Sequence, residues 1–349
     1  MKKRIPSVLL SIMIILSSLP FAAAATGCEA EYPFVINGTR FDSRPQRVVC
    51  TSRMLTDVIV EIGLYDNLVG RPFDCEITQI RSIPAVGKSD APSVSQIVEI
   101  NPDLVIIDNN TPQETVDEMV ELGLNLLFLY VPYDRLGFKN VYACIGAAMG
   151  GRSAGQKKGL DTVEGILTRL DDIQRLCEKE ETVNVCIFKT FTESGAATYV
   201  TGDEITSMGI MFAGGRNVAI QGRVGRFDLQ KTKDGDPDVI LCPEGKMVSV
   251  RSKRILVNSS ASITNRIYEY DLSKFDTMGS GLITATWELA HLFHPTIITK
   301  EMLPEGAASY ITEGRSIYTL EEYRQMVEEE RARQEAEEDT PTADDFEGE

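Results

Sequence analysis

The 349-residue sequence lacks the short motifs that mark the common classes of enzyme and metal site. It contains no Gly-x-Ser-x-Gly nucleophile turn, no Gly-x-x-x-x-Gly-Lys phosphate loop and no dinucleotide-binding glycine fingerprint. None of its seven cysteines is spaced as Cys-x-x-Cys, which argues against a redox dithiol and a zinc ribbon. The sequence therefore predicts neither an enzyme nor a resident cofactor.

The sequence also contains little histidine. The two histidines, His291 and His294, lie three residues apart near the end of a predicted helix, and no third ligand accompanies them. A helix C-terminus stabilises cationic side chains, so this pair has a structural explanation. No metal site is predicted.

Basic residues are outnumbered, with 35 Lys and Arg against 52 Asp and Glu, for a net charge of −17. The last 22 residues, 328–349, hold eleven acids and two arginines, a net charge of −9. Such a chain is poorly suited to nucleic acid. Residues 318–349 are predicted to start as a helix and to end as a solvated acidic tail.

A long apolar run occurs at the N-terminus. Lys2, Lys3 and Arg4 precede an apolar segment at 8–19 and a run of small residues, the layout of a secretory signal over residues 1–27. A retained membrane helix is the alternative, but the run is short and is interrupted by serines and Pro20. Export is therefore predicted, to the periplasm or the outer face of the cell membrane.

Cys28 follows Ala25-Thr26-Gly27, which resembles a lipoprotein processing box with Ala in place of the usual Leu. Lipidation of Cys28 would tether the protein to a membrane. Cleavage near Ala25 would instead release it. Among the other cysteines, Cys50, Cys186 and Cys242 lie in apolar strand-like runs and are predicted to be buried thiols, while disulfides remain open.

The chain is organised around a helix predicted over residues 153–180. Its apolar residues recur at steps of three and four, which indicates one buried stripe: Leu160, Val163, Ile166, Leu167, Leu170, Ile173, Leu176 and Cys177. A similar block lies on each side of it, since a helix, a Pro-Asp turn and a strand follow Ser95 and again follow Gln230. We expect an α/β protein with two Rossmann-like lobes of parallel-type sheet, 32–150 and 181–317, joined by one long helix at 151–180.

Within these lobes the patterns predict individual elements. A hairpin is expected over 32–41, with its turn at Asn37-Gly38. The first lobe has predicted strands at 47–52, 68–70, 83–88, 104–107 and 126–130 and helices at 54–63, from Ser95, and at 111–122. The second has strands at 183–188, 197–202, 238–242 and 266–270 and helices at 207–212 and 282–293, the last ended by Pro295.

Six fragments in order resemble the ABC-transporter solute-binding proteins for ferric siderophores, haem and cobalamin, whose lobes are linked by a single helix. They are Pro45-Gln-Arg-Val-Val, Glu61-Ile-Gly-Leu-Tyr-Asp-Asn-Leu-Val-Gly, Ile100-Asn-Pro-Asp-Leu-Val-Ile, Ala213-Gly-Gly-Arg-Asn, Asp236-Pro-Asp-Val-Ile-Leu and Asn265-Arg-Ile-Tyr-Glu-Tyr-Asp. The resemblance implies a monomer that captures an iron chelate, a ferric siderophore or haem, between its lobes and presents it to a permease and ATPase. Cobalamin is the alternative ligand.

One feature departs from this family. A glutamate usually precedes each Pro-Asp turn by seven residues and pairs with the permease, but here Ser95 and Gln230 occupy these positions. Glu99 and Asp228 lie near them in sequence. The departure implies a different docking chemistry or, as a function of another class, a surface scaffold that retains the fold without transport.

Ligands of open α/β sheets bind beyond the carboxyl ends of the strands, so the loops there are the candidate site. These loops carry basic residues that would favour an anionic ligand: Arg53, Arg71, Lys88, Arg135, Lys189, Arg223, Arg226 and Lys246. They also carry aromatic residues that would offer flat apolar surface: Phe73, Tyr130, Tyr133, Phe191, Phe227 and Phe275.

Overall fold

The computed structural model describes residues 31–192, 196–219, 229–310 and 329. The chain first forms the predicted hairpin, β1 (Phe34–Ile36) and β2 (Thr39–Phe41). Its turn has positive φ at Asn37 (49°) and Gly38 (86°), the geometry that two-residue hairpins favour. Thr39 Oγ1 donates to the carbonyl of Leu126 (2.5 Å), so the hairpin is fastened to the first lobe.

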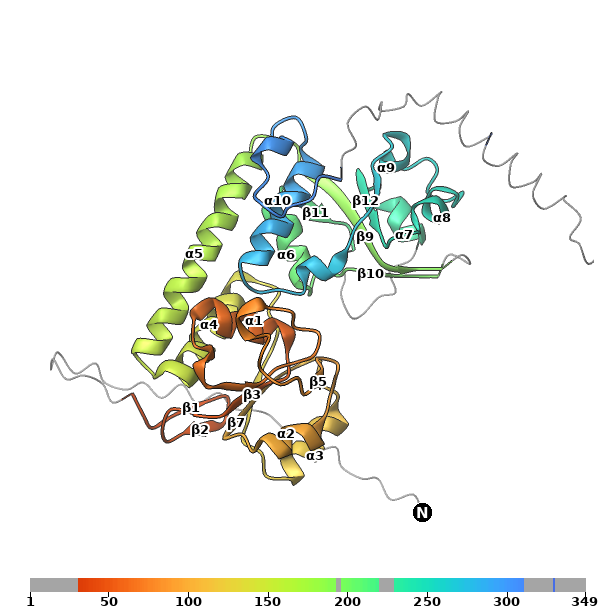
Figure 1. Cartoon of the computed structure of the whole chain (residues 1–349). Coiled ribbons are helices and arrows are strands. Elements are labelled where there is room, and N and C mark those ends of the chain that lie inside the picture. Colours follow the sequence, from red (N-terminus) through yellow and green to blue (C-terminus); the bar gives the residue numbers. More distant parts are fainter. Residues whose placement is uncertain (1–30, 193–195, 220–228, 311–328, 330–349) are drawn as a thin grey trace, which may run out of the picture. The chain divides into compact units, whose positions relative to one another are not determined.

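The N-terminal lobe contains a four-stranded parallel sheet in the order β4 (Leu68–Gly70), β3 (Val48–Cys50), β7 (Leu104–Asp108), β8 (Leu126–Leu129). Helices α1 (Arg53–Ile62) and α4 (Arg135–Gly150) pack on one face, and α2 (Val94–Ile100) and α3 (Gln113–Glu121) on the other. Side chains alternate between the faces, because Val48 and Cys50 join the first core and Val49 the second. Figure 1 shows this layering.

The connections in this lobe are short. The 3₁₀ turns Tyr65–Asn67 and Thr78–Ile80 flank β4, and a small hairpin joins β5 (Gly87–Lys88) and β6 (Ala91–Pro92). The strand expected over 83–88 is therefore wrong in extent: only its last two residues form a strand, and Ala85 makes an isolated bridge to Arg71. The helix α4 was not predicted from the sequence.

The C-terminal lobe is built on β9 (Val183–Phe191). Strands β11 (Gly215–Asn217) and β12 (Val239–Cys242) pair with it in parallel, and β13 (Ile267–Glu269) continues the sheet in parallel beside β12. The exception is β10 (Ala197–Tyr199), which is antiparallel to β9. Helices α6 (Ile205–Phe212) and α10 (Ser280–Phe293) share one core with this sheet, while α8 (Met247–Arg251) and α9 (Ser260–Ile263) share another.

The described part of this lobe also contains α7 (Leu229–Asp234) and the 3₁₀ turns Leu272–Phe275 and Lys300–Met302. Cys50, Cys186 and Cys242 are buried free thiols, as predicted. None of the six cysteines in the described part of the chain forms a disulfide.

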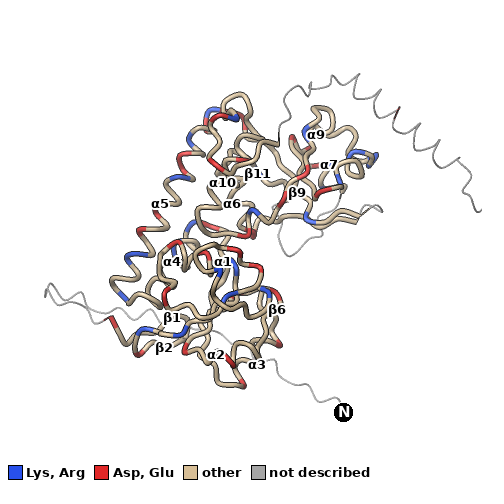
Figure 2. Tube along the Cα trace, viewed as in Figure 1, with Lys and Arg blue, Asp and Glu red and all other residues tan. Residues whose placement is uncertain are grey.

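The linking helix is α5 (Ala154–Cys177), which confirms the element around which the sequence is organised. It contacts α1 and α4 of the N-terminal lobe and α6 and α10 of the C-terminal lobe. The buried stripe is narrower than predicted, because Leu160 and Leu176 are exposed. Acidic and basic residues are interspersed along the helix (Figure 2).

The sequence echo between the lobes has a structural counterpart. Asp103 follows Pro102 and accepts hydrogen bonds from the backbone N–H of Gln46 (2.6 Å) and Arg47 (3.0 Å) before β3. Asp238 follows Pro237 and accepts one from the N–H of Asn184 (2.8 Å) in β9. Each Pro-Asp turn therefore ties the start of one strand to its parallel neighbour.

Candidate functional site

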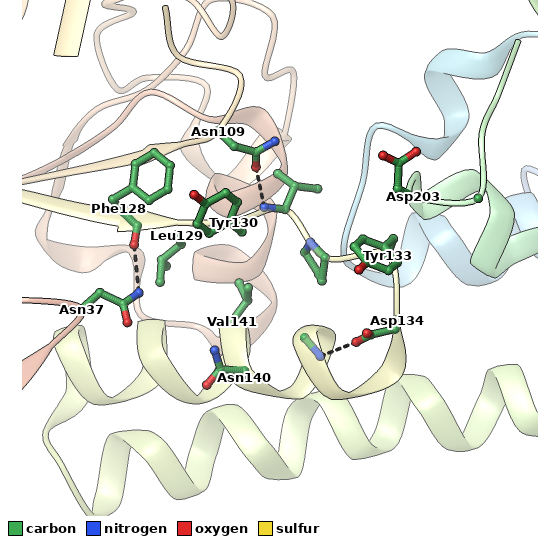
Figure 3. A pocket seen from close by; sticks show the side chains of 14 residues that line it. Asn37, Asn109, Phe128, Leu129, Tyr130, Tyr133, Asp134, Asn140, Val141 and Asp203 are labelled. Atoms are coloured by element: carbon green, nitrogen blue, oxygen red, sulfur yellow. Dashed lines mark hydrogen bonds between the residues drawn. The ribbon is translucent and has the colours of Figure 1, made fainter. Parts of the chain in front are cut away.

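A pocket of about 860 Å³ lies beyond the carboxyl ends of the strands of the N-terminal lobe. The loops after β7 and β8 and the first turns of α4 form most of it, and Gly202 and Asp203 of the C-terminal lobe complete its lining. Figure 3 shows Tyr130 and Tyr133 on the segment that joins β8 to α4, with Asp203 across the pocket from Tyr130. A space of this size is in the range of small-molecule sites.

Hydrogen bonds fix the backbone around this pocket. Asn109 Oδ1 accepts from the N–H of Val131 (2.8 Å), and Asn37 Nδ2 donates to the carbonyl of Phe128 (3.0 Å). Asp134 begins α4 as its N-cap and accepts from the N–H of Gly137 (2.7 Å). The β8–α4 segment is thus held at three points before any ligand binds.

Asp108, at the end of β7, has a structural role beside the pocket. Its carboxylate accepts from Ser52 Oγ (2.5 Å) and from the N–H of Asn110 (2.8 Å), and it is 3% exposed. Ser52 in turn caps α1 through the N–H of Leu55 (3.3 Å). The pair locks the loops after β3 and β7 together.

Exposed aromatic rings occur in two of these loops. Phe73, after β4, is 67% exposed, and Tyr130 and Tyr133, after β8, are 69% and 53% exposed. Tyr130 packs edge-on against Phe128, with ring centroids 4.9 Å apart. These three are aromatic candidates that the sequence placed in the loops, and the structure leaves their rings accessible to a ligand.

Two other aromatic candidates lie in the core of the C-terminal lobe. Phe191 is 3% exposed and packs edge-on against Phe188, with centroids 5.0 Å apart. Phe275 is 1% exposed and its ring lies against Gly209 of α6. Other side chains of the protein cover these two rings, so the rings are not accessible to a ligand.

The described basic candidates are mostly engaged by the protein itself. Arg53 pairs with Asp276 (3.6 Å), Lys189 pairs with Glu204 (2.8 Å) and Arg135 pairs with Asp171 of α5. The guanidinium of Arg71 donates to the carbonyls of Pro72, Cys75 and Arg81. Burial raises the pKa of Asp276 although Arg53 opposes the shift, so that pair is partly desolvated. Lys88 is exposed.

A second pocket, of about 530 Å³, lies at the carboxyl ends of β9, β12 and β13. It is lined by Lys189 and by three acids, Glu244, Glu269 and Asp271, together with Tyr270 and Tyr310. Sequence reasoning missed these acids because it considered only cations and aromatic rings in the loops, although Glu244 lies two residues after one predicted strand and Asp271 directly follows another.

The wall of this second pocket is held by a buried carboxyl group, that of Glu288. Glu288 of α10 is 1% exposed and accepts hydrogen bonds from Lys274 Nζ (2.6 Å) and from the N–H of Ala308 (2.7 Å). Tyr270 OH donates to the same carboxylate (3.1 Å), and the Tyr310 ring packs against that of Tyr270. Burial acts to lower the pKa of Lys274, but bonds to Glu288 and Tyr310 raise it, so the amine stays charged.

The predicted docking positions lie on exposed helix surface. Ser95 is in the first turn of α2, and Gln230 is at the start of α7, where it donates to Asp234 (2.7 Å). Glu99 is exposed one turn after Ser95. Their contact with a permease stays a prediction. Cys28, Arg223, Arg226, Phe227 and Asp228 lie outside the described residues.

No group of three or more His, Cys, Asp or Glu side chains among the described residues is arranged to hold a metal ion. His291 is instead hydrogen-bonded to the carbonyl of Ile298 and to Ser309. Within the described ranges, no helix is both long enough and apolar enough to cross a membrane.

Solved structures of other proteins share the fold of this chain. A periplasmic heme-binding protein from Pseudomonas aeruginosa is 17% identical, and the alignment covers 72% of this chain and 94% of that one, with a TM-score of 0.60. The heme-binding protein RhuT from Roseiflexus sp. RS-1, in apo form, is 20% identical over 72% and 98%, with a TM-score of 0.59. The vitamin B12 binding protein BtuF of Vibrio cholerae is 14% identical over 72% and 97%, with a TM-score of 0.57.

The sequence comparisons are consistent with this fold. No curated protein sequence matches the chain. The family described as "Periplasmic binding protein" matches residues 48–272, which include both sheets and the linking helix. Since this match extends over more than half of the sequence, the chain belongs to the periplasmic binding protein family.

Proposed function

We propose that this protein is the extracytoplasmic solute-binding component of an ABC importer and that it captures a metal chelate. The observation that carries the proposal is the set of exposed rings, Phe73, Tyr130 and Tyr133, at the carboxyl edge of the N-terminal sheet, with a pocket of about 860 Å³ beside two of them. Aromatic faces suit a flat or apolar chelate surface. Solved structures of the same fold include heme-binding and vitamin B12 binding proteins.

We consider three ligand classes: a ferric siderophore, haem and, as the alternative, a corrinoid. The mechanism is binding alone, with delivery to a permease and its ATPase. Docking would use the exposed turns around Ser95 and Gln230, with Glu99 as the acid that α2 offers. Lipidation of Cys28 would hold the protein at the outer face of the membrane.

The test is a titration of the purified protein with ferric siderophores, haemin and cobalamins, followed by calorimetry and by the melting temperature. A ligand that binds only the native state at about 100 times its Kd adds about 2.7 kcal/mol to the unfolding free energy. A saturable rise in melting temperature with one ligand class supports the proposal. If no ligand in the panel shifts the melting temperature, the scaffold function replaces transport as the better explanation.

A further inference from the structure

The motif Asn-x-Ser/Thr, in which x is not proline, occurs three times in the sequence. The three occurrences are Asn37-Gly-Thr, Asn109-Asn-Thr and Asn258-Ser-Ser. In an exported protein this motif is the acceptor of N-linked glycans, and the hydroxyl of its third residue is part of the motif. So short a motif also arises by chance, so the surroundings of each occurrence decide whether it is usable.

Two of the occurrences lie at the larger pocket and have a buried third residue. Asn37 and Asn109 both line that pocket (Figure 3). Their third residues, Thr39 and Thr111, are each 8% exposed, and Thr39 Oγ1 donates to the carbonyl of Leu126 (2.5 Å). Both asparagine side chains also hold neighbouring backbone groups. A transferase therefore cannot reach either hydroxyl in the folded chain, and a glycan at either position would obstruct the pocket.

The third occurrence lies in an exposed turn. Asn258 is exposed, and its side chain makes no hydrogen bond or ion pair within the described part of the chain. Ser260, the third residue, is half-buried at the start of α9, and its hydroxyl donates to Asp236 Oδ2 (2.9 Å) at the surface. Freeing this hydroxyl requires a much smaller local opening than freeing a buried one. Neither Asn258 nor Ser260 lines the two pockets described above.

Buried residues fix this turn on both sides of Asn258. Leu256 and Ala261 are fully buried in one core of the C-terminal lobe. Ser259 Oγ accepts from the N–H of Ser262 (3.3 Å) and donates to the carbonyl of Leu256 (2.8 Å). The turn thus keeps its shape while side chain 258 stays outside the core, so a bulky group on Asn258 displaces no packed side chain.

From these observations we propose that Asn258 is a site of N-linked glycosylation and that transfer takes place on the folded, exported protein. The proposal depends on export and is independent of ligand capture.

The co-substrate is an oligosaccharide joined to a lipid phosphate, and a transferase catalyses the step. Nδ2 of Asn258 attacks the anomeric carbon of the oligosaccharide and gives one proton to a base of the transferase. A new C–N bond forms, the C–O bond to the lipid phosphate breaks, and the lipid phosphate leaves with the electron pair. No group is oxidised or reduced.

The first test uses the full chain isolated from the cells that produce it naturally. Mass spectrometry of its glycopeptides is expected to find an oligosaccharide on the peptide that contains Asn258 and none at Asn37 or Asn109. Asn258→Gln and Ser260→Ala should each abolish the modification, whereas Ser260→Thr, which keeps the hydroxyl, should retain it. Ser259→Ala alters only the unspecified middle residue, so it is the matched control and should also retain the modification. The melting temperature of each variant shows whether it is folded.

The second test isolates the effect of folding, with a purified oligosaccharyltransferase and its lipid-linked oligosaccharide. Unfolded synthetic peptides that carry each of the three motifs should all be glycosylated. In the folded full chain, occupancy at Asn37 and Asn109 should be at least about tenfold lower than at Asn258, because their hydroxyls are reached only by local unfolding.

The outcomes keep this proposal separate from the importer function. An unmodified Asn258 in the natural protein overturns the glycosylation site, as does equal occupancy of the three positions in the folded chain. Either result leaves the importer function standing, because the ligand titration tests that function on its own. A chain that is glycosylated at Asn258 and binds no chelate would support the site and contradict the importer.

Discussion

Asp57 of α1 accepts a hydrogen bond from the backbone N–H of Gly279 (2.8 Å), which joins the two lobes at the start of α10. The same carboxylate oxygen accepts from the N–H of Met278 (3.0 Å) and from Thr277 Oγ1. One turn later, Glu61 accepts from the N–H of Ser280 (2.7 Å). Two acids of the N-terminal lobe therefore satisfy N–H groups that a helix N-terminus leaves without partners.

Asp57→Ala is expected to lower the unfolding free energy by roughly 2–3 kcal/mol, because it leaves several buried donors without an acceptor. Urea denaturation measures this. Asp66→Ala, an exposed acid just after the same helix, should stay within about 0.5 kcal/mol of the wild type. Equal effects of the two changes would show that the contact between the lobes adds little stability.

Replacing each of two glycines of α5 by alanine should change the unfolding free energy in opposite directions. A Cβ on Gly159 would collide with the carbonyl of Tyr142 in α4, whereas a Cβ on Gly165 would meet nothing within 4 Å. Gly159→Ala should cost about 1–3 kcal/mol through overpacking. Gly165→Ala should add about 0.5–1 kcal/mol, since alanine is the better helix former. Thermal unfolding of both variants checks the sign, and destabilisation by Gly165→Ala would refute the open surface there.

His294 is expected to make stability depend on pH. It is buried, and burial lowers the pKa of its imidazole below the ordinary value of 6.5. The unfolded state then binds more protons as the pH falls below that value, so the unfolding free energy decreases toward the folded-state pKa. The slope due to one proton cannot exceed about 1.4 kcal/mol per pH unit. His294→Phe should flatten the urea-denaturation profile between about pH 7 and pH 5, and an unchanged profile would contradict the assignment.

Alanine variants of Tyr133 and Phe275 should distinguish a ring that contacts the ligand from a ring that packs in the core. Tyr133→Ala is expected to weaken chelate binding by roughly 3- to 10-fold with little loss of stability, because the ring is exposed. Phe275→Ala should instead cost about 3–5 kcal/mol of unfolding free energy, since it empties a buried site. Calorimetric titration and denaturation of both variants measure the two effects. A Tyr133→Ala variant that binds the chelate as the wild type does would place the ligand away from this ring.

Local sequence patterns were sufficient to predict the turn and the helix that short stretches of the chain specify by themselves. The Asn37-Gly38 turn was predictable because few residue pairs tolerate two positive φ angles. The linking helix was predictable because its apolar residues recur at steps of three and four. The helix α4 was missed because it is rich in glycine and alanine and buried on most sides, so it shows no apolar stripe.

The sequence by itself determined the two-lobed α/β fold, the single linking helix, the family and the loops in which a ligand site would lie. Tertiary structure decided whether the described cations of those loops are paired. Arg53, Lys189 and Arg135 read as free cations along the chain, but Asp276, Glu204 and Asp171 come from other segments and pair with them. Whether two charged side chains pair depends on the distance between residues that are remote in sequence, and only the folded chain sets that distance.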